Sequence, residues 1–127
     1  MACPVVMFEI MAIRQKNLID FYTKVFGWQV QYDKEGYAYV HFPPATYRLM
    51  GGIGQAQPGV PGWGPGITFY IQVTDLAATL KNVVANGGAV AVKPVSIDGY
   101  QFAMFEDPEC NLVGVILPFG PPQTSRK

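Results

Sequence analysis

The chain has 127 residues, of which 50% are hydrophobic and 14% are charged, a composition typical of one soluble domain with a substantial core. Nine acidic side chains balance nine basic ones, which argues against binding to nucleic acid or to an anionic membrane. No apolar stretch approaches membrane-spanning length, and residues 1–6 lack a cationic segment followed by a long apolar one, so we expect a cytoplasmic protein. The two cysteines, Cys3 and Cys110, are too few for a disulfide framework, and we expect both to be thiols.

The first half of the chain predicts a strand, a helix and three more strands. Residues 5–11 form an apolar run broken only by Glu9, as in a central strand buried on both faces. The next segment is predicted to be a helix, with Asn17 and Asp20 as a capping box and Gly27 at its end. Its apolar residues recur at helical spacing, at Leu18, Phe21, Tyr22 and Val25. Three strands are then expected near residues 28–32, 37–42 and 47–53.

The second half repeats this order. Residues 67–73 predict a strand, and Thr74 or Asp75 is placed to cap a helix that ends at Asn86 and Gly87. That helix carries apolar residues at Leu76, Leu80, Val83 and Val84. Three strands follow, near residues 89–95, 100–105 and 112–117.

Short motifs also occur twice along the chain. Gly36-Tyr37 in the first half is answered by Gly99-Tyr100 in the second, and Pro44 is answered by Pro108. Each half is too small to bury its own apolar face, so the repeat predicts two modules packed into one domain, with a cleft where they meet. We assign the first module to about residues 4–53, a Gly- and Pro-rich linker to 54–66, the second module to about 67–118, and a tail to 119–127.

Two consecutive units of strand, helix and three strands resemble the vicinal oxygen chelate superfamily, which includes glyoxalase I, extradiol dioxygenases, fosfomycin-inactivating transferases and bleomycin-binding resistance proteins. The segments that carry this resemblance are Phe8-Glu9-Ile10, Phe21-Tyr22, Val25-Phe26-Gly27-Trp28 and Asp107-Pro108-Glu109-Cys110-Asn111. The resemblance implies an α+β fold in which two βαβββ modules form a curved mixed sheet around a cleft. It also implies a homodimer, because members commonly pair and unpaired strand edges need cover.

The enzymes of that family hold a divalent metal with one His, Gln or Glu at each of four strand positions. Counting from the matching motifs places these positions at Met7, Met50, Thr68 and Gly114. Thioethers are soft ligands, a lone hydroxyl is a weak one, and glycine has no side chain. We therefore predict that this chain has no metal site of the family type and no cofactor.

Strand alternation, combined with the resemblance and the repeat, predicts which side chains face the cleft. They are Met7, Glu9, Tyr39, His41, Arg48, Met50, Thr68, Tyr70, Phe102 and Met104. Trp63 in the linker is expected either to close the mouth of the cleft or only to cover the seam between the modules. This apolar and aromatic set, with a few polar groups, is typical of a small-molecule pocket; the alternative is that the side chains pack together and leave no cavity.

Two of these residues are also candidates for catalysis. A carboxylate in an apolar strand needs a partner, so Glu9 either pairs with Arg48 or faces a ligand. His41 is the only histidine, and it could act as a general base near neutral pH or only as a hydrogen-bonded wall residue. Cys110 occupies a turn position where the family usually has glycine, so that turn is expected to be strained or of another type.

These observations leave three hypotheses for function. The first is a metal-free protein that binds a small molecule, sequestering an antibiotic or an aromatic or amphipathic metabolite. The second is a lyase, isomerase or dioxygenase-type enzyme that uses Glu9 and His41, or a metal site placed elsewhere. The third is an interaction module that works through its dimer surface.

Overall fold

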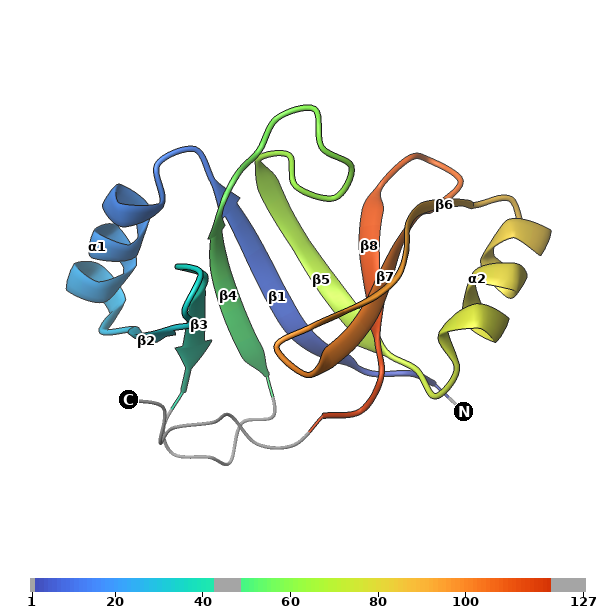
Figure 1. Cartoon of the computed structure of the whole chain (residues 1–127), viewed down its shortest axis with the longest axis horizontal. Helices are drawn as coiled ribbons and strands as arrows, with labels where there is room; N and C mark the ends of the chain where they lie inside the picture. Colours follow the sequence, from blue (N-terminus) through green and yellow to red (C-terminus); the bar gives the residue numbers. More distant parts are fainter. Residues whose placement is uncertain (1, 43–48, 120–127) are drawn as a thin grey trace.

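The computed structural model describes residues 2–42 and 49–119, which form two helices and one eight-stranded mixed sheet (Figure 1). This confirms the predicted α+β fold. The elements are β1 (Val5–Ala12), α1 (Gln15–Phe26), β2 (Gln29–Tyr32), β3 (Ala38–His41), β4 (Met50–Gln55), β5 (Gly66–Gln72), α2 (Leu76–Ala85), β6 (Ala89–Ile97), β7 (Tyr100–Glu106) and β8 (Leu112–Ile116). The strand order is β2-β3-β4-β1-β5-β8-β7-β6, so the two modules meet at β1 and β5 in the middle of the sheet.

Each module pairs its first strand with its last. β1 runs parallel to β4, and β5 runs parallel to β8, while β1 and β5 join the modules in antiparallel fashion. The register places Met7 opposite both Met50 and Tyr70, and Tyr70 opposite Gly114. These four residues therefore face one another at the junction of the modules.

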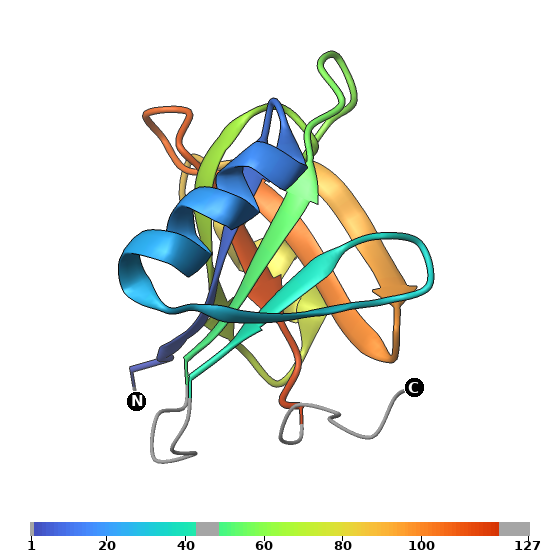
Figure 2. The same ribbon diagram turned by 90° about the vertical axis from the view of Figure 1, so that its left-hand side faces the viewer.

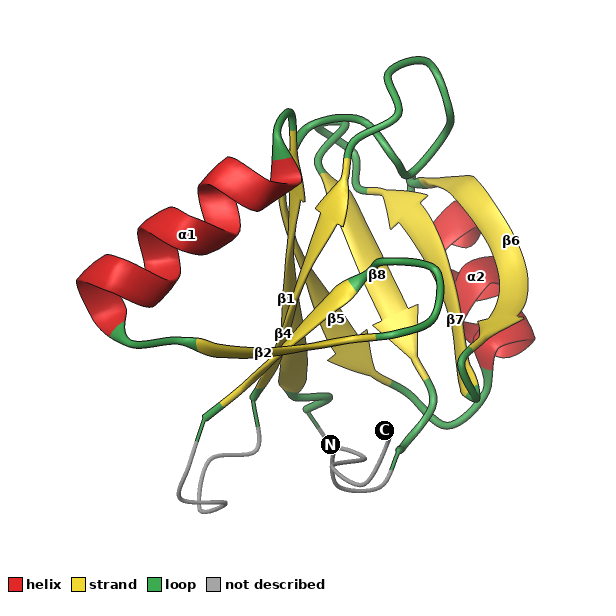
Figure 3. Ribbon diagram, turned by 60° about the vertical axis from the view of Figure 1, so that its left-hand side comes forward, coloured by secondary structure: helices red, strands yellow, loops and turns green. Residues whose placement is uncertain are grey.

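Both helices cover the outer face of the curved sheet (Figure 3). Ile19 of α1 packs into one core cluster with Ala12, Ala38, Val40 and Ile53. Leu76 and Leu80 of α2 pack into a second cluster with Val73, Ala103 and Val115. A third cluster lies on the inner face of the sheet and includes Met7, Met50, Tyr70 and Met104. In the part of the chain that the structure describes, neither helix is long and apolar enough to cross a membrane.

The helix ends follow the predictions in three places and depart from them in one. Asp75 caps α2, because its Oδ1 accepts a hydrogen bond from the backbone N–H of Ala78 at 2.9 Å. Gly27 and Gly87 end the helices with φ angles of 70° and 99°. The capping box at Asn17 and Asp20 was wrong: α1 already begins at Gln15, and its N-cap makes no side-chain hydrogen bond. The Gln15 N–H instead donates to Oε1 of Gln55 at 3.1 Å, so the end of β4 holds this helix start.

Turns from the two modules touch across the open side of the sheet, where the β2–β3 turn reaches the β6–β7 hairpin (Figure 2). The hydroxyl of Tyr39 on β3 donates to Oδ2 of Asp98, in the turn between β6 and β7, at 2.7 Å. Asp98 sits in the left-handed region with φ 55°, followed by Gly99 at 83°, as in a tight hairpin turn. The Tyr39–Asp98 hydrogen bond therefore joins the two modules.

Cys110 has a φ angle of 67°, in the left-handed region that favours glycine. Glycine is the residue that the family usually has at this position. The turn around it is held by Asp107, whose Oδ1 accepts hydrogen bonds from the backbone N–H groups of Glu109 and Asn111, each at 2.9 Å. The turn therefore keeps the geometry expected of a glycine turn and places a cysteine in a strained conformation. The thiol is exposed at the surface, as is that of Cys3.

Candidate functional site

Three of the four positions expected for the family's metal ligands, Met7, Met50 and Gly114, lie together with Tyr70 at the junction of the modules. Thr68, which the sequence analysis assigned to a ligand position, pairs with Glu9, whereas Tyr70 pairs with Met7 and Gly114, so the assignment of Thr68 stays a prediction. A side chain at position 114 would overlap the ring of Tyr70, which fills the space above Gly114. An aromatic ring therefore occupies the place from which a fourth ligand would reach the centre.

This set of groups does not fit the divalent metal of the family. It offers two thioethers, a phenol whose hydroxyl already donates to Glu9, and no side chain at all from Gly114. Divalent metals such as Zn²⁺, Mn²⁺ or Fe²⁺ take imidazole, carboxylate or thiolate ligands, whereas thioethers suit Cu(I). Within residues 2–42 and 49–119, no group of three or more His, Cys, Asp or Glu side chains is placed to hold a metal ion.

One half of the cleft is filled with side chains. Met7, Met50, Tyr70 and Met104 are between 2% and 6% exposed and pack together. The ring of Phe102 packs edge-on to Tyr70 at 5.8 Å, and the Tyr100 hydroxyl lies 3.6 Å from Sδ of Met50. Tyr39 packs against the same cluster. These side chains therefore pack together as a core and leave no cavity among them, which was the alternative to a pocket in the sequence analysis.

Glu9 is the buried polar group at the centre of the inner face. It is 8% exposed, and its two carboxylate oxygens accept hydrogen bonds from Tyr37 at 2.7 Å and from Tyr70 at 3.0 Å. Burial raises the pKa of Glu9, and the two tyrosine hydrogen bonds oppose that rise. Burial also raises the pKa of Tyr37 well above its ordinary value, and the neighbouring Glu9 adds to this effect. Both tyrosines therefore stay protonated, and their hydroxyls donate hydrogen bonds to the carboxylate of Glu9.

Of the other two ionisable candidates, Arg48 and His41, only His41 is among the described residues. Arg48 lies outside the described residues, so its pairing with Glu9 stays a prediction. His41 lies on β3 two residues after Tyr39, and burial lowers its pKa. Its Nδ1 is buried and has no hydrogen-bond partner among the described residues. The hydrogen bonds of Glu9 go to tyrosines, and none in the described ranges joins it to His41.

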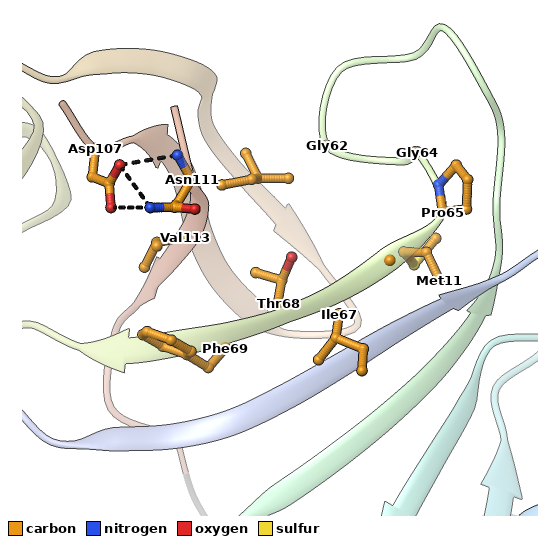
Figure 4. Close-up of a pocket in the computed structure, with 12 residues that line it drawn as sticks. Met11, Gly62, Gly64, Pro65, Ile67, Thr68, Phe69, Asp107, Asn111 and Val113 are labelled. Carbon is orange, nitrogen blue, oxygen red and sulfur yellow. Dashed lines mark hydrogen bonds between the residues drawn. The ribbon is translucent and has the colours of Figure 1, made fainter. Parts of the chain in front are cut away.

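The other end of the cleft is open. A pocket of about 380 Å³ lies between the β4–β5 loop and the turn at 107–111, with β5 as its floor (Figure 4). The Thr68 side chain points into it from β5, while Gly62, Gly64 and Pro65 contribute from the loop. The remaining lining residues are Met11, Gly66, Ile67, Phe69, Asp107, Asn111, Leu112 and Val113. This volume is within the range of small-molecule sites.

Thr68 is the polar anchor of this pocket. The Thr68 residue is 9% exposed, and its hydroxyl makes no hydrogen bond to another described residue. The hydroxyl oxygen is not fully buried, so a ligand can reach it. Asp107 and Asn111, by contrast, bond to each other at 2.9 Å and 3.2 Å and serve the turn. A ligand that enters the pocket would therefore find the Thr68 hydroxyl available as donor and acceptor.

The β4–β5 loop folds over this end of the cleft. Gly62 contacts the second module so closely that a Cβ there would lie 2.8 Å from Val92 and 3.0 Å from Met104. Trp63 is half-buried, and its backbone closes the loop through hydrogen bonds with Gln57 at 2.7 Å and Val60 at 2.9 Å. Trp63 does not line the pocket of Figure 4, so the loop backbone, and not the indole, forms its roof.

Sequence reasoning missed Tyr37, Met11 and Leu112, which belong to the inner face. Met11 follows Met7 and Glu9 by strand alternation, and Tyr37 precedes Tyr39 and His41 by the same rule. Tyr37 was also already marked as the repeat partner of Tyr100. Extending the alternation by one step at each strand end would have found these residues.

Comparison with known proteins agrees with this architecture. A family model described as the Glyoxalase/Bleomycin resistance protein/Dioxygenase superfamily matches residues 5–115. A search of curated proteins found no match.

Solved structures of similar shape share little sequence with the chain. A hypothetical protein from Bacillus halodurans C-125 is 15% identical, with a TM-score of 0.70 over 95% of this chain and 98% of that one. A glyoxalase/bleomycin resistance protein/dioxygenase superfamily member from Vibrio splendidus 12B01 is 19% identical, with a TM-score of 0.60 over 91% and 97%. A variant of methylmalonyl-CoA epimerase from Streptomyces coelicolor, in complex with 2-nitronate-propionyl-CoA, is 12% identical, with a TM-score of 0.67 over 92% and 95%. At these identities the likeness concerns the fold alone.

Proposed function

Since the chain belongs to the glyoxalase, bleomycin resistance protein and dioxygenase superfamily, we propose that it is a member that binds a small organic molecule without a divalent metal. The observation that carries this proposal is the identity of the four facing residues, Met7, Met50, Tyr70 and Gly114. Where the family's enzymes hold a metal, Met7, Met50 and Tyr70 pack into an apolar cluster. The adjoining end of the cleft keeps a pocket of about 380 Å³.

The pocket suits a small amphipathic or aromatic molecule. Met11, Pro65 and Leu112 offer apolar surface, and the Thr68 hydroxyl offers one polar contact. Gly64, where a Cβ would meet no heavy atom within 4 Å, leaves the loop backbone open to close approach by a ligand. The methionines behind the pocket can shift their flexible side chains to fit an irregular shape. Sequestration of such a molecule requires no further chemistry.

A second candidate is an acid–base enzyme, either a lyase or an isomerase. The raised pKa of Glu9, caused by burial, favours it because general acids and bases need pKa values near the operating pH. Against it stands the geometry, since both oxygens of Glu9 are engaged by Tyr37 and Tyr70. A dioxygenase activity would need a metal that the facing residues are poorly suited to hold.

Thr68→Val tests where the ligand binds. We expect the valine, which has a similar shape, to weaken binding about tenfold, because the ligand loses one hydrogen bond. The probes are a panel of small aromatic and amphipathic compounds, bleomycin included, and the measurement is thermal stabilisation followed by calorimetric titration of each compound that stabilises the chain. Thr23→Val, at an exposed position on α1, is the matched control and should bind like the wild type.

The same titrations repeated with a chelator separate binding from metal chemistry. The proposal expects the affinity to be unchanged by EDTA. Binding that disappears with EDTA and returns with Zn²⁺ or Mn²⁺ would contradict the metal-free reading. Equal affinities of wild type and Thr68→Val would contradict the placement of the ligand beside Thr68.

A further inference from the structure

An imidazole and two thioethers lie in one row across three neighbouring strands, β3, β4 and β1. Met7 of β1 is paired with Met50, the first residue of β4. β3 and β4 are antiparallel, and Val40 is paired with Gly51. The next step along this register places His41, the last residue of β3, beside Met50. The row therefore runs from His41 through Met50 to Met7.

All three side chains belong to the inner face of the curved sheet. Met7 and Met50 are 6% and 3% exposed and lie in the cluster on that face. On β3, Val40 packs into the core cluster beneath α1, whereas Tyr39 packs against the inner cluster, so alternation turns His41 inward. Neighbouring strands are about 4.7 to 4.9 Å apart, and two of the three side chains are long and flexible. The three side chains can therefore reach one common point.

His41 brings an unused nitrogen to this row. Its Nδ1 is buried, and no described residue forms a hydrogen bond with it. Buried polar atoms have a partner in the great majority of cases, so an unpartnered one calls for a specific explanation. Burial lowers the pKa of His41, so its ring is neutral near pH 7. A neutral imidazole can bind a metal ion through its free nitrogen without first releasing a proton.

The sulfur of Met50 also keeps capacity for a further contact. The hydroxyl of Tyr100 lies 3.6 Å from this Sδ. A thioether sulfur has two lone pairs, so the contact with Tyr100 leaves one of them available. A ligand bound there would sit next to the hydrophobic cluster, where little water reaches it.

The other two inner-face methionines direct their sulfur atoms elsewhere. A Cβ at Gly62, in the β4–β5 loop, would lie 3.0 Å from Sδ of Met104. A Cβ at Gly54 would lie 2.9 Å from Sδ of Met11. Both sulfurs therefore face glycine backbone outside the row, and we leave Met104 and Met11 out of the ligand set.

One imidazole and two thioethers suit a soft monovalent cation. Thioethers select Cu(I), whereas the divalent ions of the family take imidazole, carboxylate or thiolate ligands. The apolar surroundings act in the same direction, because the cost of taking an ion out of water rises with its charge. The residues that fail as a site for Zn²⁺ or Mn²⁺ thus meet the requirements of Cu(I).

We propose that Nδ1 of His41, Sδ of Met50 and Sδ of Met7 form a binding site for a soft monovalent metal ion of the Cu(I) type. None of these three residues lines the pocket beside Thr68, so the two sites are separate. The metal site does not depend on the function proposed for the pocket, and either can fail without the other.

The first test is an anaerobic titration of the full chain with Cu(I), in competition with the chromophoric chelator bicinchoninate. Cys3→Ser and Cys110→Ser are introduced first, because both exposed thiols would bind copper themselves. We expect one Cu(I) per chain, and an affinity at least about tenfold weaker after Met50→Leu or His41→Phe. Met11→Leu is the matched control, because Met11 is 5% exposed on the same strand as Met7. It should bind like its parent.

The second test needs no substitution in the site, so a variant that fails to fold does not affect it. The same cysteine-free chain is labelled at its methionine methyl groups, and Ag(I) serves as a redox-inert substitute for Cu(I). We expect the nuclear magnetic resonance signals of Met7 and Met50 to shift, and those of Met11 to stay in place. Zn²⁺ at the same concentration should shift none of them.

Several results would overturn the proposal. One is a cysteine-free chain that does not retain Cu(I) against bicinchoninate. Others are folded Met50→Leu and His41→Phe chains that bind as tightly as their parent, or a Met11→Leu chain that loses affinity as they do. Shifts of the Met7 and Met50 signals by Zn²⁺ as large as those by Ag(I) would contradict the preference for a soft monovalent ion.

Discussion

Replacing Gly114 by alanine is expected to lower the free energy of unfolding by about 2 to 3 kcal/mol. The added Cβ would overlap the ring of Tyr70. That ring cannot move freely, because its hydroxyl donates to Glu9 at 3.0 Å and its edge packs on Phe102 at 5.8 Å. Urea denaturation of the wild type and the variant measures the loss.

Two further variants make this result specific. Gly64→Ala is the control, because no heavy atom lies within 4 Å of a Cβ at that position, and it should change stability by less than about 0.5 kcal/mol. Tyr70→Ala removes the ring, so Gly114→Ala should cost much less in that background than in the wild type. Strict additivity of the two losses would mean that the ring does not occupy the space above Gly114.

Replacing Tyr37 by phenylalanine is expected to cost about 2 kcal/mol at pH 7 and clearly less at pH 4. The variant leaves one oxygen of a buried carboxylate without its donor, which lies 2.7 Å away in the wild type. The loss depends on pH because the hydrogen bond is strongest when Glu9 is ionised. Denaturation of both chains at the two pH values measures the difference.

The direction of this pH dependence follows from the pKa of Glu9. Burial raises its folded-state pKa above the ordinary value of 4.5, so the folded chain binds more protons than the unfolded chain between the two values. This contribution to stability is present below 4.5 and is lost as the pH rises through the folded-state pKa. Loss of the Tyr37 hydroxyl raises the folded-state pKa of Glu9 further. The gap between the unfolded-state and folded-state pKa values then widens, and the variant becomes less stable than the wild type as the pH rises.

Two controls accompany this experiment. Tyr32→Phe changes a tyrosine that is 50% exposed, and it should have little effect at either pH. Glu9→Gln removes the titrating group, so the part of the pH dependence that belongs to Glu9 should disappear. An equal loss for Tyr37→Phe at pH 4 and pH 7 would show that Glu9 does not change its ionisation in this range.

The sequence predicted the fold and the orientation of most inner-face residues, because strand alternation is a strict geometric rule. Met7, Met50, Tyr70 and Met104 all lie on the inner face, as expected. Whether they leave a cavity could not be predicted, because alternation gives the direction of a side chain and not the volume of its neighbours. The filling of the space above Gly114 by Tyr70 is a contact between separate strands, and no local pattern records it.

The register of β5 against β1 also limited what the sequence could predict. Thr68 was assigned to a metal-ligand position by counting back from the segment that caps α2, and the structure pairs Met7 with Tyr70, two residues on. A shift of two residues keeps a side chain on the same face, so the pattern of apolar residues does not distinguish these two positions. The pairing of Glu9 with Tyr37 was missed for a related reason, since Tyr37 lies one residue before β3 as the structure defines it.

The most direct test of metal-free binding is native mass spectrometry of the chain purified without chelators, together with elemental analysis of the same sample. We expect an organic molecule to be retained by the folded chain, divalent metal to be far below one ion per chain, and the melting temperature to be unchanged by EDTA. About one Zn, Ni, Fe or Mn ion per chain, with a melting temperature that falls when EDTA is added, would contradict the account.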